Sequence, residues 1–378
     1  MLFRIDRDQL AEAVAWTARS LPTRPSMPVL AGMRLEVTDD HRLKLSGFDY
    51  EVSAEVTLDL ETGEPGVVLV SGRLLAEITR ALPAQPVNFT LDGAKAVVTC
   101  GSTRFTLLTM PVEDYPSLPV MPPAAGRVGS DVFASAVAQV AVAVGKDDTL
   151  PMLTGVRMEI EGDLITLAAT DRYRLAVREL KWEPAQPGLQ AVAMIPGRTL
   201  ADIAKALGGT GAEVEIALSS GGTGEGMIGF SSAGRRTTTR LLDPDFPKFS
   251  QLFPTEFTAT ATIPTSAFVE AVKRVALVAE RNTPVRLTFR GGEVVLEAGS
   301  GDEAQAVEVL PVDFEGDEIT IAFNHQYLLD GLAVLDSDVA RMQFTTPTKP
   351  AIITAGKPAG EEAASDYRYL IMPIRLSS

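Results

Sequence analysis

The chain has 378 residues, which is enough for two or three domains of roughly 150 residues, each able to bury a core of its own. Its hydrophobic content of 46% and charged content of 22% are typical of a globular protein, and its apolar runs stay well below the ~18 residues of a membrane span. A net charge of −15 argues against a generally basic nucleic-acid-binding protein, but it is compatible with a local basic surface.

The N-terminal stretch, MLFRIDRDQL, carries charges where a signal peptide needs an apolar segment. Cys100 is the only cysteine of the chain, so the sequence has no disulfide framework. Both features indicate a reducing compartment, and we expect the protein in the cytoplasm.

The first predicted element is a helix whose buried face recurs at i, i+4, i+7 and i+11. This spacing occurs three times along the chain, at Leu10, Val14, Thr17 and Leu21, at Phe133, Val137, Val140 and Val144, and at Phe268, Val272, Val275 and Ala279. Polar residues predict the start of each helix: Asp8, Asp131, and Thr265 or Ser266. A polar turn, a proline and a predicted strand follow each helix.

A second predicted helix also occurs three times, as SGRLLAEITRALP from Ser71, PGRTLADIAKALG from Pro196 and FNHQYLLDGLAVLD from Phe323. Alternating stretches such as RLKLSGFDYEVSAEV and LITLAATDRYRLAVREL predict strands around these helices. Gly72 and Gly197 are 125 positions apart (197 − 72), a period too long for a solenoid repeat. We therefore predict an α+β protein with three copies of one domain, each with two helices packed on antiparallel sheets.

Two proline-rich linkers indicate the domain boundaries, because MPVEDYPSLPVMPPAAG ends near Gly126 and LLDPDFPKFSQLFPTE ends near Glu256. We expect domains at residues 1–126, 127–256 and 257–378. The tail YLIMPIRL is apolar and contains a proline, whereas chain ends are usually polar and frayed. Since no further domain follows it, we expect this tail to leave a groove open at the junction of copies two and three.

The motifs typical of catalysis give weak signals. GEGMIG at 224–229 matches a dinucleotide-binding fingerprint, with Asp243 about 20 residues further on, but a strand-like stretch follows it instead of a helix. We interpret these glycines as a hairpin loop, and keep a nucleotide-dependent oxidoreductase as an alternative that a failure to bind dinucleotides would remove. His41 and His325 lie alone, without cysteine neighbours, so we expect no metal site, no cofactor and no enzymatic activity.

Basic residues recur on the predicted helices, with acidic residues among them. The basic set is Arg19, Arg73, Arg80, Lys146, Arg198, Lys205, Lys273, Arg274 and Arg281. These positions fit either an ordinary solvated helix face or a surface that holds phosphates weakly and without sequence preference.

The motifs RPSMPVLAG, TLPMLTGVRMEI, ATDRYRLAV, FPKFSQLFP, VALVAERNTPVRL and YLIMPIRL, in this order, resemble the bacterial DNA polymerase III beta subunit, the sliding clamp, and look closest to its actinobacterial members. The resemblance covers the whole chain. It implies a non-catalytic processivity factor: a head-to-tail homodimer whose six domains encircle duplex DNA and which an ATP-driven loader opens. A domain of about 125 residues is about 35 Å across, and six in a ring leave a hole of about that width. A duplicated clamp with a specialised role, such as inhibitor resistance, is the alternative.

The resemblance also implies a pocket at the tail. The polymerase III alpha subunit, the clamp loader, other polymerases and repair proteins insert a short Gln-Leu-Phe-type motif there. The matching residues are Leu153, Thr170, Arg172, Tyr173, Arg174, Leu175, Pro247, Asn324, Tyr327, Met372, Pro373, Ile374, Arg375 and Leu376. Tyr173 stands where many members have histidine. Without the resemblance, the sequence favours ordinary core packing for Leu175 and Met372.

Two further sets of residues follow from the resemblance. The residues expected to face DNA are Arg24, Arg73, Arg80, Lys146 and Arg198. The dimer interface is expected to pair the strand TRFTLL of copy one with the first helix of copy three, through Arg104, Phe105 and Leu277. Alternation in TRFTLL leaves Phe105 equally open to a core position.

Overall fold

The computed structural model describes the whole chain except residues 210, 220–225, 280–282, 300–303, 357–365 and 376–378. Within the described residues, six α-helices and 27 strands repeat one order three times. Each repeat has a strand, a helix, a first set of three strands, a pair of strands, a second helix and a final set of three strands. The paired strands run antiparallel. Examples are residues 42–48 with 52–59 and residues 164–170 with 174–181. The prediction of three α+β copies with two helices each is confirmed.

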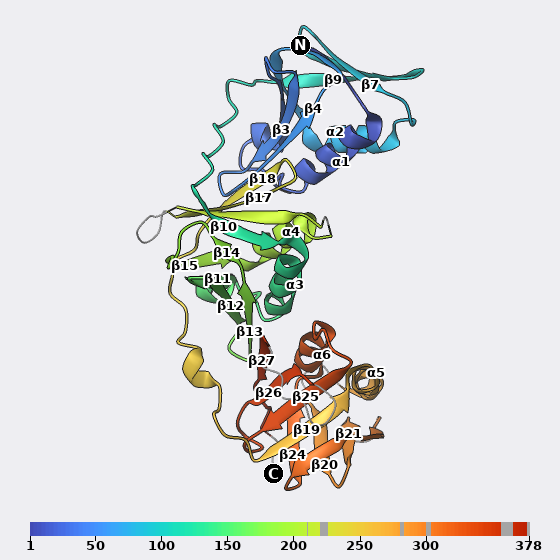
Figure 1. Cartoon of the computed structure of the whole chain (residues 1–378). Coiled ribbons are helices and arrows are strands. Elements are labelled where there is room, and N and C mark those ends of the chain that lie inside the picture. Colours follow the sequence, from blue (N-terminus) through green and yellow to red (C-terminus); the bar gives the residue numbers. More distant parts are fainter. Residues whose placement is uncertain (210, 220–225, 280–282, 300–303, 357–365, 376–378) are drawn as a thin grey trace. The chain divides into compact units, whose positions relative to one another are not determined.

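The bounds of the elements show the repeat directly (Figure 1). Copy one consists of β1 (Leu2–Ile5), α1 (Arg7–Ala18), η1 (Pro28–Ala31), β2 (Gly32–Val37), β3 (Arg42–Phe48), β4 (Val52–Asp59), β5 (Thr62–Glu64), β6 (Gly66–Ser71), α2 (Gly72–Ala81), β7 (Val87–Asp92), β8 (Lys95–Cys100) and β9 (Thr103–Met110). Copy two consists of β10 (Ala124–Gly129), α3 (Ser130–Ala141), η2 (Pro151–Leu153), β11 (Gly155–Glu161), β12 (Leu164–Thr170), β13 (Arg174–Lys181), β14 (Glu183–Pro184), β15 (Gln190–Pro196), α4 (Gly197–Leu207), β16 (Glu213–Leu218), β17 (Met227–Ser232) and β18 (Arg235–Arg240), followed by η3 (Ser250–Leu252) in the linker. Copy three consists of β19 (Ala259–Pro264), α5 (Thr265–Val275), η4 (Ala276–Val278), β20 (Val285–Arg290), β21 (Glu293–Ala298), β22 (Ala306–Pro311), β23 (Asp313–Gly316), β24 (Ile319–Phe323), α6 (His325–Ala333), β25 (Val339–Phe344), β26 (Ala351–Ala355) and β27 (Tyr367–Ile371).

The first three positions of each predicted spacing lie on the first helix of that copy, whereas the fourth positions, Leu21, Val144 and Ala279, lie beyond the helix ends. The positions that are almost completely buried include Leu10, Val14, Phe133, Val137, Phe268 and Val272. The start of α1 differs from the prediction by two residues, because the Asp6 carboxylate, not that of Asp8, accepts the first free backbone N–H groups. Asp8 lies in the first turn, where a negative charge is favourable beside the helix dipole. In copy one, α1 and α2 pack against each other and α1 lies over β3 and β4 (Figure 1).

The chain forms two compact units. Unit one comprises Met1–Ser130, Glu183–Gln186 and Lys205–Leu241, and it contains a 14-stranded sheet in the order β14-β10-β16-β17-β18-β4-β3-β2-β6-β9-β8-β7-β1-β5. Unit two comprises Asp131–Trp182, Pro187–Ala204 and Leu242–Ser378. It contains a nine-stranded sheet, β15-β11-β12-β13-β27-β26-β25-β19-β23, and a four-stranded sheet, β22-β21-β20-β24. Copy two contributes strands to both units, and the boundaries at 126 and 256 stay a prediction.

Each unit contains one seam where the sheet of one copy continues into the next. In seam one, β18 pairs with β4, from Arg235 opposite Val56 to Thr239 opposite Val52. In seam two, β13 pairs with β27, from Arg174 opposite Ile371 to Arg178 opposite Tyr367. Both seams join the same two strands of the repeat: the last strand of the first three-stranded hairpin set and the last strand of the copy.

The glycine-rich motif precedes a strand. Its first two residues, 224 and 225, lie outside the described residues, and Met227–Ser232 forms β17, which pairs with β18. The motif therefore runs into a strand, which begins at Met227, and not into a nucleotide-binding helix. No described helix is long and apolar enough to cross a membrane. In the part of the chain that the structure covers, no three His, Cys, Asp or Glu side chains form a group that could hold a metal ion.

Candidate functional site

The turn between β12 and β13 is built by an aspartate that holds two backbone N–H groups. The Asp171 Oδ1 atom accepts hydrogen bonds from the backbone nitrogens of Tyr173 at 3.0 Å and Arg174 at 3.1 Å. Arg172 has φ 79°, a left-handed conformation that the tight turn requires. As a result, Tyr173 points outward with 56% of its surface exposed, whereas the Arg174 side chain is only 4% exposed.

The same turn occurs in copy one. The Asp49 Oδ1 atom accepts from the backbone nitrogens of Glu51 at 3.0 Å and Val52 at 2.7 Å, and Tyr50 has φ 76°. The turn is therefore a repeated element of the domain, and it forms equally well before a valine and before an arginine.

The tail of the chain runs beside the copy-two turn after β27 ends. The backbone N–H of Met372 donates to the carbonyl oxygen of Tyr173 at 2.8 Å, and that of Ile374 donates to the carbonyl of Ala322 at 2.8 Å. The Met372 and Ile374 side chains stay 38% and 36% exposed. We call the exposed apolar side chains of Tyr173, Met372 and Ile374 the tail surface.

A buried arginine connects this turn to α6. Arg174 Nε donates to Asp171 Oδ2 at 3.0 Å and its Nη1 donates to Asp330 Oδ2 at 2.5 Å. The guanidinium carbon lies 4.3 Å from the centre of the Tyr327 ring. The second oxygen of Asp330 accepts from Gln326 Nε2 at 2.7 Å. The buried positive charge is thus matched by two carboxylates and an aromatic face, as a charge away from water requires.

Three tyrosines complete the contacts around this charge. The rings of Tyr173 and Tyr327 stack with centroids 6.1 Å apart, and the Tyr369 hydroxyl donates to the Tyr327 carbonyl oxygen at 2.7 Å. Burial raises the pKa of the phenols of Tyr327 and Tyr369 above the ordinary value. Burial by itself lowers the pKa of the Arg174 guanidinium, but Tyr369 and the two carboxylates more than offset this and raise the pKa. With raised pKa values, the phenols of Tyr327 and Tyr369 stay neutral and the Arg174 guanidinium stays charged at neutral pH.

The structure brings together five of the residues predicted for partner binding. They are Tyr173, Arg174, Tyr327, Met372 and Ile374. Thr170 serves the turn itself, because its buried hydroxyl donates to the Arg174 carbonyl at 2.7 Å and accepts from the Arg172 backbone nitrogen at 3.2 Å. The Asn324 side-chain oxygen caps α6 by accepting from the backbone nitrogens of Gln326 and Tyr327.

The other predicted partner-binding residues lie on several different elements. Leu153 is buried on η2, where its carbonyl accepts from the Gly145 backbone nitrogen at 2.7 Å. Leu175 is buried in a core cluster that includes Leu370. Pro247 is exposed on the second linker, and Pro373 and Arg375 belong to the tail. Leu376 lies outside the described residues.

The predicted DNA-facing residues are exposed in both units. In unit one, Arg73 Nη2 donates to the Pro22 carbonyl oxygen at 3.0 Å, which holds the loop that carries Arg24, and Arg80 lies in the last turn of α2. In unit two, Lys146 follows α3 and Arg198 lies in the first turn of α4.

The predicted interface residues lie on a strand and a helix end. On β9, Arg104 is exposed and Phe105 is half-buried, and on η4 the Leu277 side chain is 84% exposed. Beside η4, the Arg274 guanidinium holds both carboxylate oxygens of Glu308 on β22, at 3.0 and 2.5 Å. The strand β22 is an edge of its sheet in the described structure.

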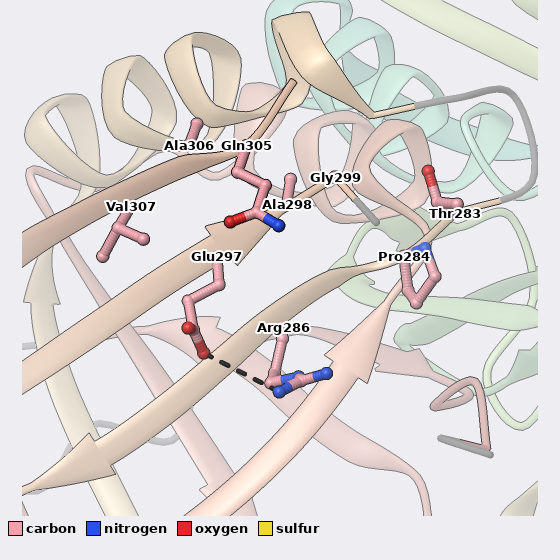
Figure 2. Close-up of a pocket in the computed structure, with 9 residues that line it drawn as sticks. All are labelled: Thr283, Pro284, Arg286, Glu297, Ala298, Gly299, Gln305, Ala306 and Val307. Atoms are coloured by element: carbon pink, nitrogen blue, oxygen red, sulfur yellow. Dashed lines mark ion pairs between the residues drawn. The ribbon is translucent and has the colours of Figure 1, made fainter. Parts of the chain in front are cut away.

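A separate hollow of about 440 Å³ lies in copy three, and no residue of the tail surface is among its lining residues. Figure 2 shows its lining, with Gln305 just before β22, Ala306 and Val307 at the start of β22, and the ion pair between Arg286 and Glu297 at 4.0 Å. None of the residues predicted from the sequence for any site lines this hollow.

The sequence reasoning missed Asp171 and Asp330, which hold the buried charge of the site. The signal for Asp171 was present, because Asp49 and Asp171 occupy the same position in two copies of the repeat. Asp330 is 156 residues from Arg174, and no local pattern links the two.

Comparison with known proteins agrees with this architecture. Sequence profiles of the DNA polymerase III beta subunit match three consecutive parts of the chain: the N-terminal domain at residues 1–119, the central domain at 127–248 and the C-terminal domain at 250–375. The beta sliding clamp of Streptomyces coelicolor is 62% identical over 378 residues and covers 100% of both chains. The beta sliding clamp homolog GriR of Streptomyces muensis is 44% identical over 375 residues, with 99% of each chain covered.

A solved structure extends the agreement to three dimensions. The crystal structure of the DNA polymerase sliding clamp from Bacillus subtilis matches with a TM-score of 0.90 at 26% sequence identity, and all of both chains is covered. The three repeated domains, their order and the sequence identity lead to one conclusion: the chain belongs to the DNA polymerase III beta subunit family, the sliding clamps.

Proposed function

We propose that two copies of this chain join head to tail into a ring of six domains that encircles duplex DNA. The ring has no catalytic task; it tethers the replicative polymerase and other replication and repair proteins, which bind the tail surface through a short Gln-Leu-Phe-type peptide. The identity to the Streptomyces coelicolor clamp, 62%, exceeds that to the GriR homolog, 44%, which favours a general clamp over a specialised copy.

The observation that carries the ring is the rule shared by the two seams. In each, the last strand of the first hairpin set of one copy pairs with the last strand of the next copy. In copy three the last strand of the first hairpin set is β22, and no further copy follows it. In copy one the last strand is β9, and no copy precedes it. The rule therefore pairs β22 of one chain with β9 of a second chain. In the described structure, β22 is an edge, and β9 reaches β6 only through Thr109 and Met110. Repetition of one seam in a closing rotation gives a ring.

The repeat also predicts the register of this third seam. Ala54 lies opposite Thr237 in seam one, and Ala176 lies opposite Tyr369 in seam two. The residue of copy three equivalent to these alanines is Ala306, since it pairs with Ala298 as Ala54 pairs with Gly47. The third seam therefore places Phe105 opposite Ala306 of the partner subunit.

This register explains the exposed apolar residue on η4. In seam one the side chains of this sheet face reach the first helix, because Arg235 of β18 forms an ion pair with Glu12 of α1. By the same geometry, Phe105 of one subunit approaches α5 and η4 of the next, where Leu277 is exposed. Burying two apolar side chains against each other gives the seam a hydrophobic centre.

The opposite face of the third seam carries complementary charges. Residues directly opposite in antiparallel strands share a face, so Arg104 shares one with Val307 of the partner subunit, which itself pairs with Glu297. Two strand spacings are about 10 Å, a distance that an arginine and a glutamate can bridge together. The third seam thus forms beside the hollow of Figure 2, with Glu297 placed to receive Arg104.

A charge swap tests this arrangement. We expect Arg104→Glu or Glu297→Arg alone to weaken the dimer about tenfold, and the two together to restore it, because the like charges become a pair again. Light scattering over a dilution series reads out the mass, with 40.3 kDa for one chain and twice that for the ring. A monomer at every concentration of the unchanged protein contradicts the ring itself.

Two more experiments address the proposed ligands. A ring threaded on DNA stays on a closed circle after loading and is lost when the circle is cut, whereas an ordinary DNA-binding protein is lost from both with the same salt dependence. Binding of a labelled Gln-Leu-Phe-type peptide tests the tail surface. Its exposed methionine and tyrosine are suited to apolar peptide anchors, because methionine adapts to irregular partners and tyrosine combines an apolar ring with a hydrogen-bonding tip.

A further inference from the structure

Arg174 belongs to the residues that the family resemblance assigns to partner binding, but its guanidinium is turned away from solvent. The side chain is 4% exposed, compared with 56% for its neighbour Tyr173. Its donors are directed to Asp171 and Asp330, and its flat face lies 4.3 Å from the Tyr327 ring centre. A peptide on the tail surface meets Tyr173 and Met372 before it can reach this charge.

The partners of Arg174 come from two copies of the repeat. Asp171 lies in the turn of copy two that presents Tyr173, while Asp330 and Tyr327 lie on α6 of copy three. The same turn also receives the backbone hydrogen bond of Met372 through the carbonyl of Tyr173. One buried charge thus connects the elements that carry the tail surface.

Copy one shows which parts of the structure form without this arginine. Val52 occupies the equivalent position, directly after an identical aspartate turn and opposite Thr239 in seam one. The turn and the strand pairing therefore form without a charge at this place. A buried charge is costly unless it is fully paired, so its presence in seam two alone points to a task specific to that seam.

We propose that Arg174 is a positioning residue for partner binding: it fixes the turn of copy two against α6 of copy three, so that Tyr173, Tyr327 and Met372 form the peptide-binding surface before the peptide arrives. The peptide does not touch the guanidinium. This inference rests on the proposed binding of a peptide at the tail surface. Pre-formed surfaces bind more tightly because less order has to be created on binding.

The chemistry requires arginine and not merely a positive charge. The guanidinium bonds two carboxylates from different directions and presents a flat face to Tyr327. A lysine ammonium is a point charge on a flexible stem, so it cannot reproduce the two directions and the stacked face together. The peptide affinity of Arg174→Lys is therefore expected to lie between that of the unchanged protein and that of Arg174→Met.

Two peptides distinguish positioning from direct contact. One carries an acidic residue beside the Gln-Leu-Phe-type motif, and the other has the corresponding amide. If Arg174 positions the surface, Arg174→Met weakens the binding of both peptides by the same factor, about tenfold, and leaves the ratio of their affinities unchanged. If Arg174 pairs with the peptide, the acidic peptide alone loses affinity, and the proposal is overturned. Unchanged affinity for both peptides overturns it as well.

Two variants serve as matched controls. Arg172→Met removes the exposed arginine of the same turn. Because Arg172 itself belongs to the predicted partner-binding residues, this variant is the control for the position of Met372 only, which is expected to stay unchanged. Arg174→Met combined with Asp330→Asn removes a charge of each sign, so it relieves the unpaired carboxylate and is expected to recover part of the affinity. Thermal unfolding and light scattering confirm that each variant is folded, and Arg174→Lys replaces Arg174→Met if the latter fails to fold.

A readout without peptide separates the inference from the function on which it rests. In the protein labelled with ¹³C at the methionine methyl groups, we expect the Met372 signal, assigned with Met372→Leu, to move in Arg174→Met and to stay in place in Arg172→Met. If the unchanged protein binds neither peptide but the Met372 signal still moves, the proposed peptide function fails while the positioning of the tail stands. A Met372 signal that does not move contradicts the positioning role.

Discussion

Seam one and seam two have the same backbone pairing but different chemistry. Seam one is closed by neutral hydroxyl groups: Ser53 Oγ and Thr238 Oγ1 lie 2.6 Å apart in the buried sheet, and Thr237 Oγ1 donates to the Ser53 carbonyl at 2.8 Å. Seam two contains the buried charge of Arg174 between two carboxylates. The repeat therefore fixes how the strands pair, while the side chains decide which seam holds a buried charge.

The two linkers differ in the same sense. The first packs Tyr115 on a cluster that belongs entirely to copy one and includes Phe48 and Leu69. The second packs Phe246, Phe249 and Phe253 on a cluster that combines Leu175 and Val177 of copy two with Ile352 and Leu370 of copy three. The second linker thus braces the two copies of its seam, next to the tail surface.

The largest expected effect concerns the proposed third seam between β9 of one chain and β22 of a second chain. Leu277→Asp or Phe105→Asp places a carboxylate at its apolar centre, and a buried unpaired charge costs about 3–5 kcal/mol, which corresponds to at least a hundredfold weaker dimer. We expect soluble monomers by light scattering.

Val120→Asp is the matched control, because Val120 is 89% exposed on the first linker and its replacement is expected to leave the dimer intact. A persistent dimer in both Leu277→Asp and Phe105→Asp places the interface elsewhere on the chain.

The next effect tests the difference between the linkers. Phe249→Ala removes an aromatic side chain that packs against residues of both copies, and we expect a loss of about 2–3 kcal/mol, since the ring is only partly buried. Hydrogen exchange should accelerate at the backbone amides of β13 and β27.

Tyr115→Ala provides the comparison. We expect faster hydrogen exchange in β2, β3 and β6 and an unchanged exchange rate in the strands of seam two. If Phe249→Ala accelerates exchange in only one of the two copies, the second linker does not brace the seam.

A smaller effect is expected in seam one. Thr238→Val removes one partner of a buried hydroxyl pair and leaves Ser53 unsatisfied, at a cost of about 1–2 kcal/mol in the free energy of unfolding. Ser53→Ala combined with Thr238→Val should cost less than the sum of the single changes, because both polar groups are then removed. Strict additivity in chemical denaturation argues against a bond between the two hydroxyls.

Much of the fold was predictable because it depends on local spacing. The i, i+4, i+7 pattern from Leu10 and its recurrence from Phe133 and Phe268 identify the buried helix faces, since only one face of a helix can meet the sheet. The cap of α1 was misplaced by two residues, from Asp6 to Asp8, because both aspartates satisfy the same local preference and only the backbone geometry selects one.

The candidate site was predictable in its location but not in the roles of its residues. The family pattern brings Arg174 and Asn324 to the tail, but burial of a charge depends on partners such as Asp330, which lies 156 residues away. Asn324 shows the same limit, because its side chain caps α6 and a cap is recognised only once the helix start is known. Long-range pairing and local capping compete with binding for the same polar groups, and the sequence alone does not rank them.

The smallest expected effect concerns an exposed ion pair at the edge of copy three. The hydrogen bond from Arg274 lowers the pKa of the Glu308 carboxyl below its ordinary value of 4.5. A carboxylate with a lowered folded-state pKa stabilises the fold above its unfolded pKa, and this contribution is lost as the pH falls through the folded-state value. We therefore expect Glu308→Gln to melt slightly below the unchanged protein at pH 7, by less than Thr238→Val does, because solvent screens exposed pairs.

The comparison between pH 7 and pH 3 makes this prediction specific. Once Glu308 is protonated in the unchanged protein, the two proteins carry the same charge at this position, so the difference in melting temperature should shrink towards zero in acid. Glu318→Gln, at an exposed glutamate of the same unit, is the control for the change in net charge and should show a smaller difference at pH 7. A Glu308→Gln difference that grows in acid contradicts a stabilising role for the charge of Glu308.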